Sequence, residues 1–565
     1  MKHLGPISGI ACHRGRYVAT AGYDNQLILW DGLSRKALQR AYHDHLANQC
    51  AFSPDGRLVA SASSDYTARL YEVPAMRLRA VFDGHTDDIE QVAFSPDGTR
   101  VATCSRDGTL RLFDLSGRTL AHMVGHEADV ISVSFMPDGR EIISSSDDGT
   151  VRRWSAETGE QVACLSFDDV ETDALAITPE GLVIAGNDDG EISTIDGEAV
   201  QTVKAHDAGI KRLVYDAPSA RLVSLSYDRK LCLWRVEGAS LRLEASAALP
   251  DIVWPRSCAF FDDTRLVFAT FGSSFAIYDV AADSWDVAGI EPSISVNAVM
   301  RHDGAVWTIG DAGVLRRDGV VAGEVGSLCN FLAELDGRVV SGGQMGRIFD
   351  ARTGAVLHQH RSPLNCAASF VRDGVPHVAV GAYTGELVVL RAEGGEVAHV
   401  ATVPVHRNAI KGVASDGVHL FTVCADRSAA FVRIADLAVA AMHEDGHDKI
   451  ANGCATVGDG VFVSVSRDLH LRVWTQEGAR AIRSPHGNSI KCVAVNGSLV
   501  ATGSYAGVIA IYDLEAEDWV EARRVTAAGL SCVVAGGAPG SFLIASYDGV
   551  VYPFAVAPEA RAHAA

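Results

Sequence analysis

A tight turn that recurs at an almost constant interval is the feature that most constrains how this chain can fold. It is clearest between residues 125 and 154, where runs of alternating polar and apolar residues are joined by turns at 137–139 and 147–149. Alternation with a period of two, interrupted by Asp-Gly turns, is typical of β-strands joined as hairpins. A further run at 161–165 completes a predicted four-stranded antiparallel meander.

The same turn repeats along the whole chain. Successive copies are about 40 residues apart, which is the period typical of four-stranded propeller blades. One such sheet cannot bury both of its faces alone, so it must stack on copies of itself. The turn position is occupied in succession by Asp24, Asp65, Asp107, Asp148, Asp189, Asp228, Gly272, Asp311, Met345, Thr384, Asp426, Asp468, Ala506 and Asp548.

These units predict an all-β fold of two tandem seven-bladed β-propellers made of four-stranded antiparallel blades. The length of 565 residues is too great for one core, and propellers usually carry about four to eight blades. We place the boundary near Gly289, which gives an N-terminal propeller over residues 1–289 and a C-terminal propeller over residues 290–565. No overlapping strand is visible that would close either ring, so the mode of closure stays open.

Short signature pairs flank the strands of many units. Gly-His pairs precede the first strand at 84–85, 125–126 and 446–447. The third strand ends in an aromatic residue followed by Asp at 30–31, 113–114, 278–279 and 512–513. In these features the chain resembles WD-repeat β-propeller proteins, and the resemblance covers essentially its whole length.

The resemblance implies a buried hydrogen-bonded set in many blades. In that family the set consists of a His, a Ser or Thr, an Asp and a Trp of one blade. Two further sets here are near matches that end in Tyr71 and Phe113. The four full matches are His3, Thr20, Asp24 and Trp30; His126, Ser144, Asp148 and Trp154; His206, Ser224, Asp228 and Trp234; and His447, Ser464, Asp468 and Trp474.

A recurring Ser, His and Asp also resembles a hydrolytic triad. An active site occurs once per protein, whereas this trio recurs in blade after blade, so we interpret it as structural. Two histidine pairs, His43 with His45 and His358 with His360, lack a clustered carboxylate or cysteine that would complete a metal site. No phosphate-binding Gly-rich loop and no Gly-x-Ser-x-Gly motif occurs. We therefore expect no catalytic residue, no metal and no cofactor.

Charge and cysteine usage narrow the choice of partners. The formal net charge is −21 at pH 7, and an acidic surface repels phosphate backbones, so nucleic acid is an unfavourable partner. No apolar run reaches the length of a membrane span, and the first residues do not resemble a signal peptide. The 12 cysteines are spread along the chain without a Cys-x-x-Cys pair, which is typical of reduced thiols. We expect a cytoplasmic protein that does not bind a membrane.

If the scaffold residues repeat, function is expected at solvent-facing positions that vary between units. In WD-repeat propellers, the residue before the turn Asp and the residue five after the His face the top surface around the channel. Six of the fourteen residues before the turn position are aromatic, although aromatics make up 7% of the chain. Such residues dominate protein–protein hot spots because they combine a large area with a polar group. The alternative is that Tyr simply suits strand ends.

These positions predict two different faces. The first propeller presents acids from its third to fifth units: Asp88, Glu90, Asp129, Asp147, Asp188 and the run at 168–173. Its predicted partner-binding residues are Tyr23, Arg106, Lys211, Tyr227 and Phe271. Those of the second propeller are Asn365, Tyr383, Lys411, Asn452, Arg467, Lys491, Tyr505 and Tyr547. The second face is aromatic and basic to neutral, so we expect it to dock a protein segment that carries acids.

The expected function is that of a non-enzymatic scaffold that binds partner proteins or peptides on the top faces of its propellers. Similarity to bacterial WD-repeat proteins suggests a signalling NTPase or a protease as partner, in a signalling, stress or defence complex. Two alternatives stay open. One is an enzyme with a pocket in the central channel, which requires a non-repeating cluster of acids or histidines. The other is an RNA-binding propeller whose aromatic residues stack on bases, and steep salt dependence of binding would favour it.

Overall fold

All regular elements in the described part of the protein are β-strands. The computed structural model describes residues 1–13, 15–167 and 170–556. Within these residues the strands form fourteen antiparallel sheets, thirteen with four strands and the last with three. The predicted all-β fold of four-stranded antiparallel blades is confirmed, and the arrangement is consistent with tandem propellers. Two acids of the predicted acidic face, Asp168 and Asp169, lie outside the described residues.

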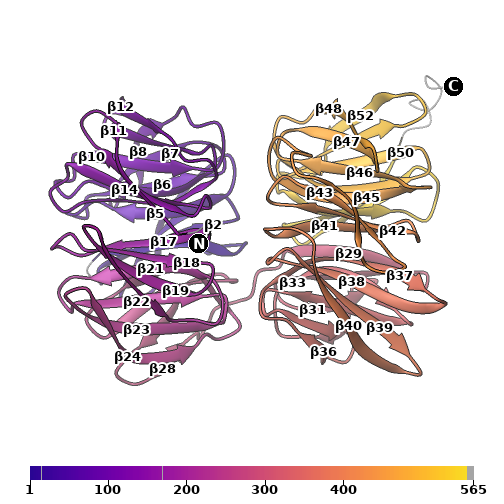
Figure 1. Cartoon of the computed structure of the whole chain (residues 1–565), viewed down its shortest axis with the longest axis horizontal. Coiled ribbons are helices and arrows are strands. Elements are labelled where there is room, and N and C mark those ends of the chain that lie inside the picture. Colours follow the sequence, from indigo (N-terminus) through magenta and orange to yellow (C-terminus); the bar gives the residue numbers. More distant parts are fainter. Residues whose placement is uncertain (14, 168–169, 557–565) are drawn as a thin grey trace. The chain divides into compact units, whose positions relative to one another are not determined.

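The chain divides into two compact units, Met1–Ser293 and Ile294–Ala565 (Figure 1). The predicted boundary near Gly289 stays a prediction. Among the residues that the structure describes, no helix has the length and hydropathy needed to cross a membrane.

The first unit contains the sheets formed by β1 to β28, each made of consecutive strands. Their bounds are β1 (Ile7–His13), β2 (Tyr17–Gly22), β3 (Gln26–Asp31), β4 (Ala37–Tyr42), β5 (Ala47–Phe52), β6 (Leu58–Ser63), β7 (Ala68–Glu72), β8 (Arg77–Phe82), β9 (Ile89–Phe94), β10 (Arg100–Ser105), β11 (Thr109–Asp114), β12 (Thr119–Val124), β13 (Val130–Phe135), β14 (Glu141–Ser146), β15 (Thr150–Ser155), β16 (Gln161–Ser166), β17 (Thr172–Ile177), β18 (Val183–Asn187), β19 (Glu191–Asp196), β20 (Ala199–Lys204), β21 (Ile210–Asp216), β22 (Arg221–Ser226), β23 (Lys230–Glu237), β24 (Ser240–Ala248), β25 (Val253–Phe260), β26 (Arg265–Thr270), β27 (Ala276–Asp279) and β28 (Ser284–Asp286).

The second unit contains the sheets formed by β29 to β55, again of consecutive strands. Their bounds are β29 (Val296–His302), β30 (Ala305–Gly310), β31 (Val314–Arg317), β32 (Val320–Glu324), β33 (Cys329–Leu335), β34 (Arg338–Gly343), β35 (Arg347–Asp350), β36 (Ala355–Gln359), β37 (Leu364–Arg372), β38 (Val375–Ala382), β39 (Glu386–Glu393), β40 (Glu396–Pro404), β41 (Ile410–Ser415), β42 (His419–Cys424), β43 (Ala429–Arg433), β44 (Val439–His443), β45 (Ala451–Gly458), β46 (Val461–Ser466), β47 (His470–Thr475), β48 (Gly478–Arg483), β49 (Ile490–Asn496), β50 (Leu499–Ser504), β51 (Val508–Asp513), β52 (Asp518–Arg524), β53 (Leu530–Ala535), β54 (Ser541–Ser546) and β55 (Val551–Ala555).

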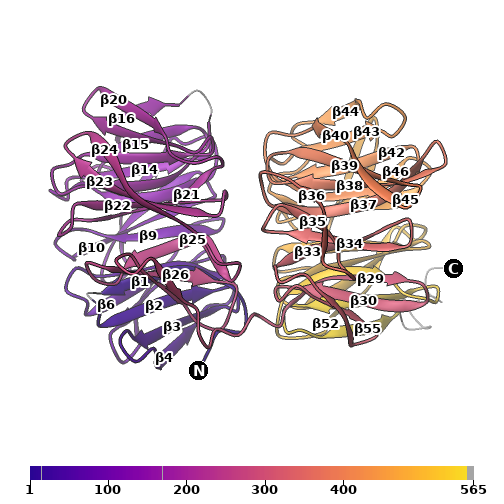
Figure 2. The same ribbon diagram turned by 90° about the horizontal axis from the view of Figure 1, so that it is seen from below.

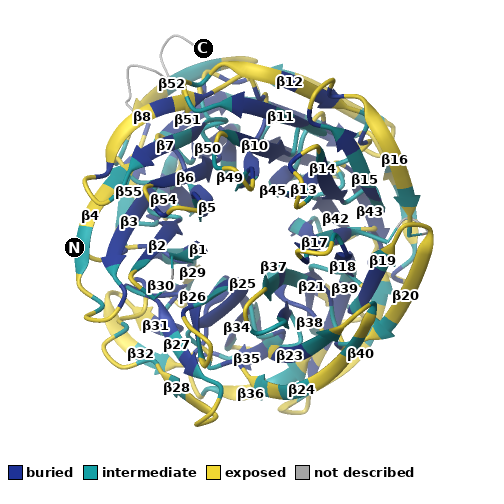
Figure 3. Cartoon of the chain, turned by 90° about the vertical axis from the view of Figure 1, so that its left-hand side faces the viewer, coloured by how far each residue is buried: buried dark blue, intermediate teal, exposed yellow. Residues whose placement is uncertain are grey.

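The strands of each sheet follow one another from the ring axis outward. In the sheet β17–β20, β17 lies nearest the axis and β20 lies on the periphery (Figure 3). Burial follows the same order: β18 is buried along its whole length, whereas β20 is largely exposed. Successive innermost strands contact one another, as β5 contacts β9 and β9 contacts β13. Each sheet therefore buries both faces between two neighbours, and the outermost strand meets solvent.

Each ring closes without exchange of a strand, because every sheet consists of consecutive strands. In the first unit β1 lies beside β25 (Figure 2). A buried apolar cluster joins the first and last sheets there, with the ring centroids of Trp30 and Phe275 5.8 Å apart. In the second unit β29 contacts β53, and the Ser531 hydroxyl donates to the Val296 carbonyl at 2.5 Å. Packing and side-chain hydrogen bonds thus close both rings.

Closure of the first ring also depends on a glycine in β1, Gly9, which has no side chain. A Cβ atom on Gly9 would lie 2.6 Å from the Cα atom of Gln49 and 2.8 Å from the Asn48 carbonyl oxygen. Because Gly9 leaves this space free, the Gln49 amide reaches from β5 past β1 to β25 and donates to the Ser257 hydroxyl at 3.2 Å. The second and seventh sheets therefore meet across the first.

We predict that Gly9→Ala lowers the free energy of unfolding by about 1–3 kcal/mol, because the new methyl group must displace backbone of the neighbouring strand. Urea unfolding of the full chain measures the effect. Gly487→Ala is the matched control, since a Cβ atom there meets nothing within 4 Å. Equal midpoints for the wild type and Gly9→Ala would contradict the close approach described here.

Candidate functional site

The buried His–Ser–Asp–Trp sets are the most regular side-chain constellation in the molecule. In one of them, Nδ1 of His126 donates to Asp148 at 2.8 Å. The Ser144 hydroxyl lies 2.7 Å from Nε2 of His126 and accepts from the Trp154 indole N–H at 2.8 Å. Although burial raises the pKa of Asp148, hydrogen bonds from His126 and Thr150 hold it well below its usual range. The set connects the turn to the second and third strands.

Two other predicted sets of the first unit share this geometry. In each, the His ring lies between the Asp and the hydroxyl, and the Trp donates to that hydroxyl. The distances, in the order His–Asp, His–hydroxyl and Trp–hydroxyl, are 2.9, 2.7 and 2.7 Å for His3, Asp24, Thr20 and Trp30. They are 3.0, 2.8 and 2.9 Å for His206, Asp228, Ser224 and Trp234.

The fourth predicted set contains an additional member. Nδ1 of His447 lies 4.0 Å from Asp468, too far for a hydrogen bond. The Arg472 guanidinium lies between them, 3.1 Å from Nδ1 and 2.6 Å from the carboxylate. Burial and the neighbouring Arg472 lower the pKa of His447 to about 3, so the ring is neutral. Ser464 still links His447 to Trp474, at 3.0 and 2.7 Å. The expected direct His–Asp contact is wrong in this blade, because an arginine occupies the space.

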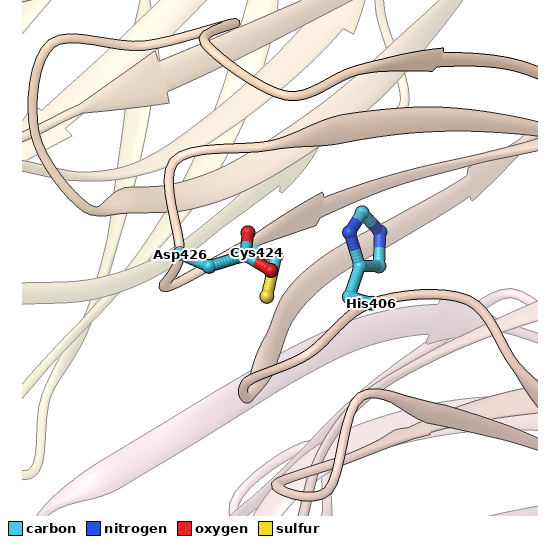
Figure 4. A group of neighbouring side chains, drawn as sticks. All are labelled: His406, Cys424 and Asp426. Atoms are coloured by element: carbon cyan, nitrogen blue, oxygen red, sulfur yellow. The ribbon is translucent and has the colours of Figure 1, made fainter. Parts of the chain in front are cut away.

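Two groups of side chains among the described residues have the spacing of metal ligands, with ligand atoms within 4.8 Å of one another. One is Asp448, Asp468 and His470, and the more buried one is His406, Cys424 and Asp426 (Figure 4). Both ring nitrogens of His406 already have partners, with Ser428 Oγ at 2.5 Å and Thr422 Oγ1 at 2.8 Å. Burial raises the pKa of Cys424 well above its usual value and lowers that of His406 to about 4. A neutral thiol and a fully hydrogen-bonded imidazole are poor metal ligands. We assign the group to the structural set of its blade.

The top end of each unit, defined as the end at which the innermost strands begin, gathers two residues from each sheet. These are the second residue of the innermost strand and the residue after the second strand. Antiparallel register brings them to one edge, as Ile210 pairs with Ser226. In most innermost strands a β-bulge at the second residue changes the direction in which its side chain points. Lys211 and Tyr227 meet in this way, with Nζ 5.1 Å from the ring centroid.

The predicted cations of the first unit are neutralised within the unit. Arg106 donates to Glu90 at 2.5 Å and to Asp129 at 2.6 Å. Lys211 forms ion pairs with both Asp173 and Asp188. Their charges are therefore satisfied by the protein itself rather than held free for a partner.

More carboxylates than cations gather at this end, and some of them share protons. Glu171 is hydrogen-bonded to Asp188, and Asp147 to Asp173. Burial, together with the charges of Asp188 and Asp173, raises the pKa of Glu171 to about 8. Burial, together with Glu171 and Asp173, also raises the pKa of Asp147 well above its usual range. Glu171 therefore holds a proton near neutral pH, and Asp147 is harder to ionise than a free carboxyl group.

Two of the predicted aromatic residues of the first unit pack against a tryptophan, and the third, Tyr227, lies beside Lys211. Trp254 lies between Tyr23 and Phe271, with ring centroids 5.2 and 5.1 Å away. Arg256 covers the Trp254 ring at 5.5 Å and donates to Glu90 at 2.9 Å. Phe271 is only 2% exposed, which makes it a packing residue. Sequence reasoning missed Trp254, although it holds the same strand position as Lys211.

The second unit has a different top end. Nζ of Lys411 lies 4.5 Å from the Tyr383 ring centroid. The rings of Tyr505 and Tyr547 stack with their centroids 6.2 Å apart. Proximity to Tyr505 and Tyr383 raises the pKa of Lys491. Within the described part of the chain, neither Lys411 nor Lys491 forms an ion pair with a carboxylate. Arg467, directly after β46, lies half-buried at the same end.

Two of the predicted partner-binding residues link adjacent sheets instead. The side-chain amide of Asn365 donates to the Ile410 carbonyl at 3.1 Å, and that of Asn452 donates to the Ile490 carbonyl at 2.7 Å. Asn452 is buried. An equivalent bond joins Asn48 of the first unit to the Ile89 carbonyl at 3.0 Å. The recurrence of Asn at this strand position was the signal in the sequence for a structural role.

Comparison with protein families identifies the repeat. The family described as "WD domain, G-beta repeat" matches residues 37–72, 76–114, 117–155 and 197–235. The chain contains WD40 repeats. Each matched WD40 repeat begins on or just before the outermost strand of one sheet and ends with the third strand of the next, as 37–72 runs from β4 to β7. The sequence repeat is therefore offset from the sheet by one strand.

Two adjacent serines of β14 test the role of the buried sets. Ser144 and Ser145 are both 0% exposed, but among the described residues the Ser145 hydroxyl has no hydrogen-bond partner. We predict that Ser144→Ala lowers the free energy of unfolding by about 1–3 kcal/mol, because His126 and Trp154 lose their shared partner. Ser145→Ala should change it by less than about 0.5 kcal/mol or stabilise the protein. Equal effects in chemical denaturation would contradict this assignment.

The shared protons of the first unit predict a pH-dependent stability. The pKa of Glu171 is about 8 in the folded protein against 4.5 for the free group, so the folded state binds more protons between these values. Stability must then fall as pH rises through that window. We predict that Glu171→Gln reduces the loss of melting temperature between about pH 5 and 8. Glu198→Gln, at an exposed site, is the control, and identical pH profiles for all three proteins would refute the prediction.

Proposed function

We propose that this chain is a non-enzymatic interaction scaffold whose main docking surface is the top end of the second unit. Proteins with WD40 repeats are typically scaffolds for protein interactions. The docking surface consists of Tyr383, Lys411, Arg467, Lys491, Tyr505 and Tyr547, with Asn365 and Asn452 beneath it as links between sheets. The aromatic residues and cations supply large contact areas with polar groups, as interface hot spots require.

One comparison within the molecule carries the proposal. Lys211, Lys411 and Lys491 hold the same position, the second residue of an innermost strand that begins with Ile. Lys211 is paired with two aspartates, whereas neither Lys411 nor Lys491 has a carboxylate partner among the described residues. A half-buried ammonium group without a counter-ion attracts negative charge. The partner is therefore a protein segment that carries acidic groups.

The identity of the partner follows from analogy alone. A signalling NTPase or a protease in a signalling, stress or defence complex fits the expectation drawn from bacterial WD-repeat proteins. The cytoplasm is the proposed compartment. The first unit offers Tyr23 and Tyr227 as additional contact residues. Arg106, Lys211 and Phe271 lie beneath that surface and stabilise it. Arg106 and Lys211 form ion pairs with carboxylates of the same unit, and Phe271 packs on Trp254.

An affinity capture from the native cell, analysed by mass spectrometry, tests the proposal. The wild type is compared with the triple variant Lys411→Glu, Arg467→Glu, Tyr505→Ala. We predict that a specific partner is lost in the triple variant, because charge reversal repels an acidic segment and the Tyr505 ring is removed. The partner should also elute from the wild type at raised salt.

The control variant Arg391→Glu, Arg433→Glu changes two exposed arginines near the ends of third strands, at the opposite end of the same sheets. It should keep the partner. Both variants must melt like the wild type. If the triple variant captures the same proteins as the control, the docking surface is elsewhere and the proposal fails. Capture of nucleic acid with steep salt dependence would favour the RNA-binding alternative instead.

A further inference from the structure

Arg212 differs from the other cations near the axis of the first unit. It is the third residue of β21, directly below Lys211 and after the bulge that re-aims that lysine. The thiols of Cys258 and Cys50, which belong to β25 and β5, are close enough to interact electrostatically with its guanidinium. These strands lie in the second and seventh sheets, whereas Arg212 lies in the sixth. The guanidinium therefore extends from its own strand toward the ring axis.

The charge of Arg212 is not balanced by the protein. Within the described residues it forms no hydrogen bond and no ion pair, and its Nε is buried without a partner. By contrast, Arg106, Lys211 and Arg256 each form at least one ion pair with a carboxylate. Burial lowers the pKa of Arg212, the direction expected of a guanidinium that loses water and gains no counter-ion.

The walls near Arg212 are polar but uncharged. Burial raises the pKa of both Cys50 and Cys258 to about 12, so both thiols are neutral. The amide of Gln49 and the hydroxyl of Ser257 lie on the same two strands as these thiols and bond to each other at 3.2 Å. An anion at this level would meet one strong donor and neutral polar groups.

We propose that the axis of the first unit binds a small oxyanion, a carboxylate or a phosphate, with the guanidinium of Arg212 as its principal ligand. A guanidinium offers a planar fork of N–H donors that matches two oxygens of such an anion. Arg212 is half-buried, so solvent reaches it while much of its hydration is lost. A bound anion would supply the missing counter-charge. This inference is independent of the docking surface on the second unit.

Titration calorimetry of the full chain with inorganic phosphate, at constant ionic strength, tests the inference directly, and acetate serves as a second probe. The two probes distinguish a tetrahedral anion from a carboxylate. The wild type should bind at least one of them saturably, with a matching rise in melting temperature. Arg212→Gln should weaken that binding at least about tenfold, because a charge-assisted bidentate contact is lost.

Three variants make the result decisive. Arg242→Gln removes an exposed arginine and should bind like the wild type. Lys411→Gln removes a cation of the docking surface, so any anion binding that it loses is assigned to that surface and not to Arg212. Arg212→Lys keeps the charge without the planar fork, so it should bind with intermediate affinity, and it serves as the test if Arg212→Gln does not fold. In buffer without either probe, Arg212→Gln should melt no lower than the wild type, since it removes a half-buried charge without a counter-ion.

The inference is overturned if neither anion binds the wild type at millimolar concentration. It is also overturned if Lys411→Gln, rather than Arg212→Gln, abolishes binding. A lower melting temperature of Arg212→Gln without either probe, together with unchanged anion affinity, would assign Arg212 a structural role.

Discussion

Burial of sheet faces around a closed ring is the constraint on which each unit depends. The apolar clusters lie between neighbouring sheets rather than within one, as in the cluster that joins Leu112 of β11 to Val133 of β13. In the first unit the Trp30–Phe275 contact completes the circle, and Trp30 also belongs to a buried hydrogen-bonded set. Trp30 therefore contributes both to the hydrogen bonds within its own sheet and to the closure of the ring. Opening the ring at any point would expose two apolar faces at once.

The two units use one framework with opposite electrostatics at their top ends. In the first, acids and cations are paired and surplus protons are retained by carboxyl pairs such as Glu171 with Asp188. In the second, Lys411 and Lys491 lie beside tyrosines with no carboxylate partner in the described residues. Since the strand positions are equivalent, the difference arises from neighbouring sheets and not from the blade itself. This separation allows a strongly acidic chain to carry lysines without carboxylate partners at one end, as the proposed docking surface requires.

The fold could be predicted from the sequence because its signals are local and repeated. The turn Asp, the preceding Gly-His pair and the closing aromatic all lie within one repeat, so their spacing also indicated the buried sets. The top ends were harder to predict, because their side chains meet partners from other sheets. Arg106 of the third sheet donates a hydrogen bond to Asp129 of the fourth, and Arg256 of the seventh sheet donates one to Glu90 of the third. The insertion of Arg472 between His447 and Asp468 depends on side-chain reach, which strand spacing alone does not report.

The offset between WD40 repeat and sheet has a consequence for how such a ring can change in size. Loss of one repeat would remove the outermost strand of one sheet together with three strands of the next. The strands left on either side, such as β1–β3 and β8, could then form one complete hybrid sheet. Duplication would work in the same way, so every intermediate in a lineage could keep sheets with a full set of strands. The number of sheets in a ring can thus change by one repeat at a time. The limit is the curvature that packing between neighbouring sheets tolerates, and not strand pairing.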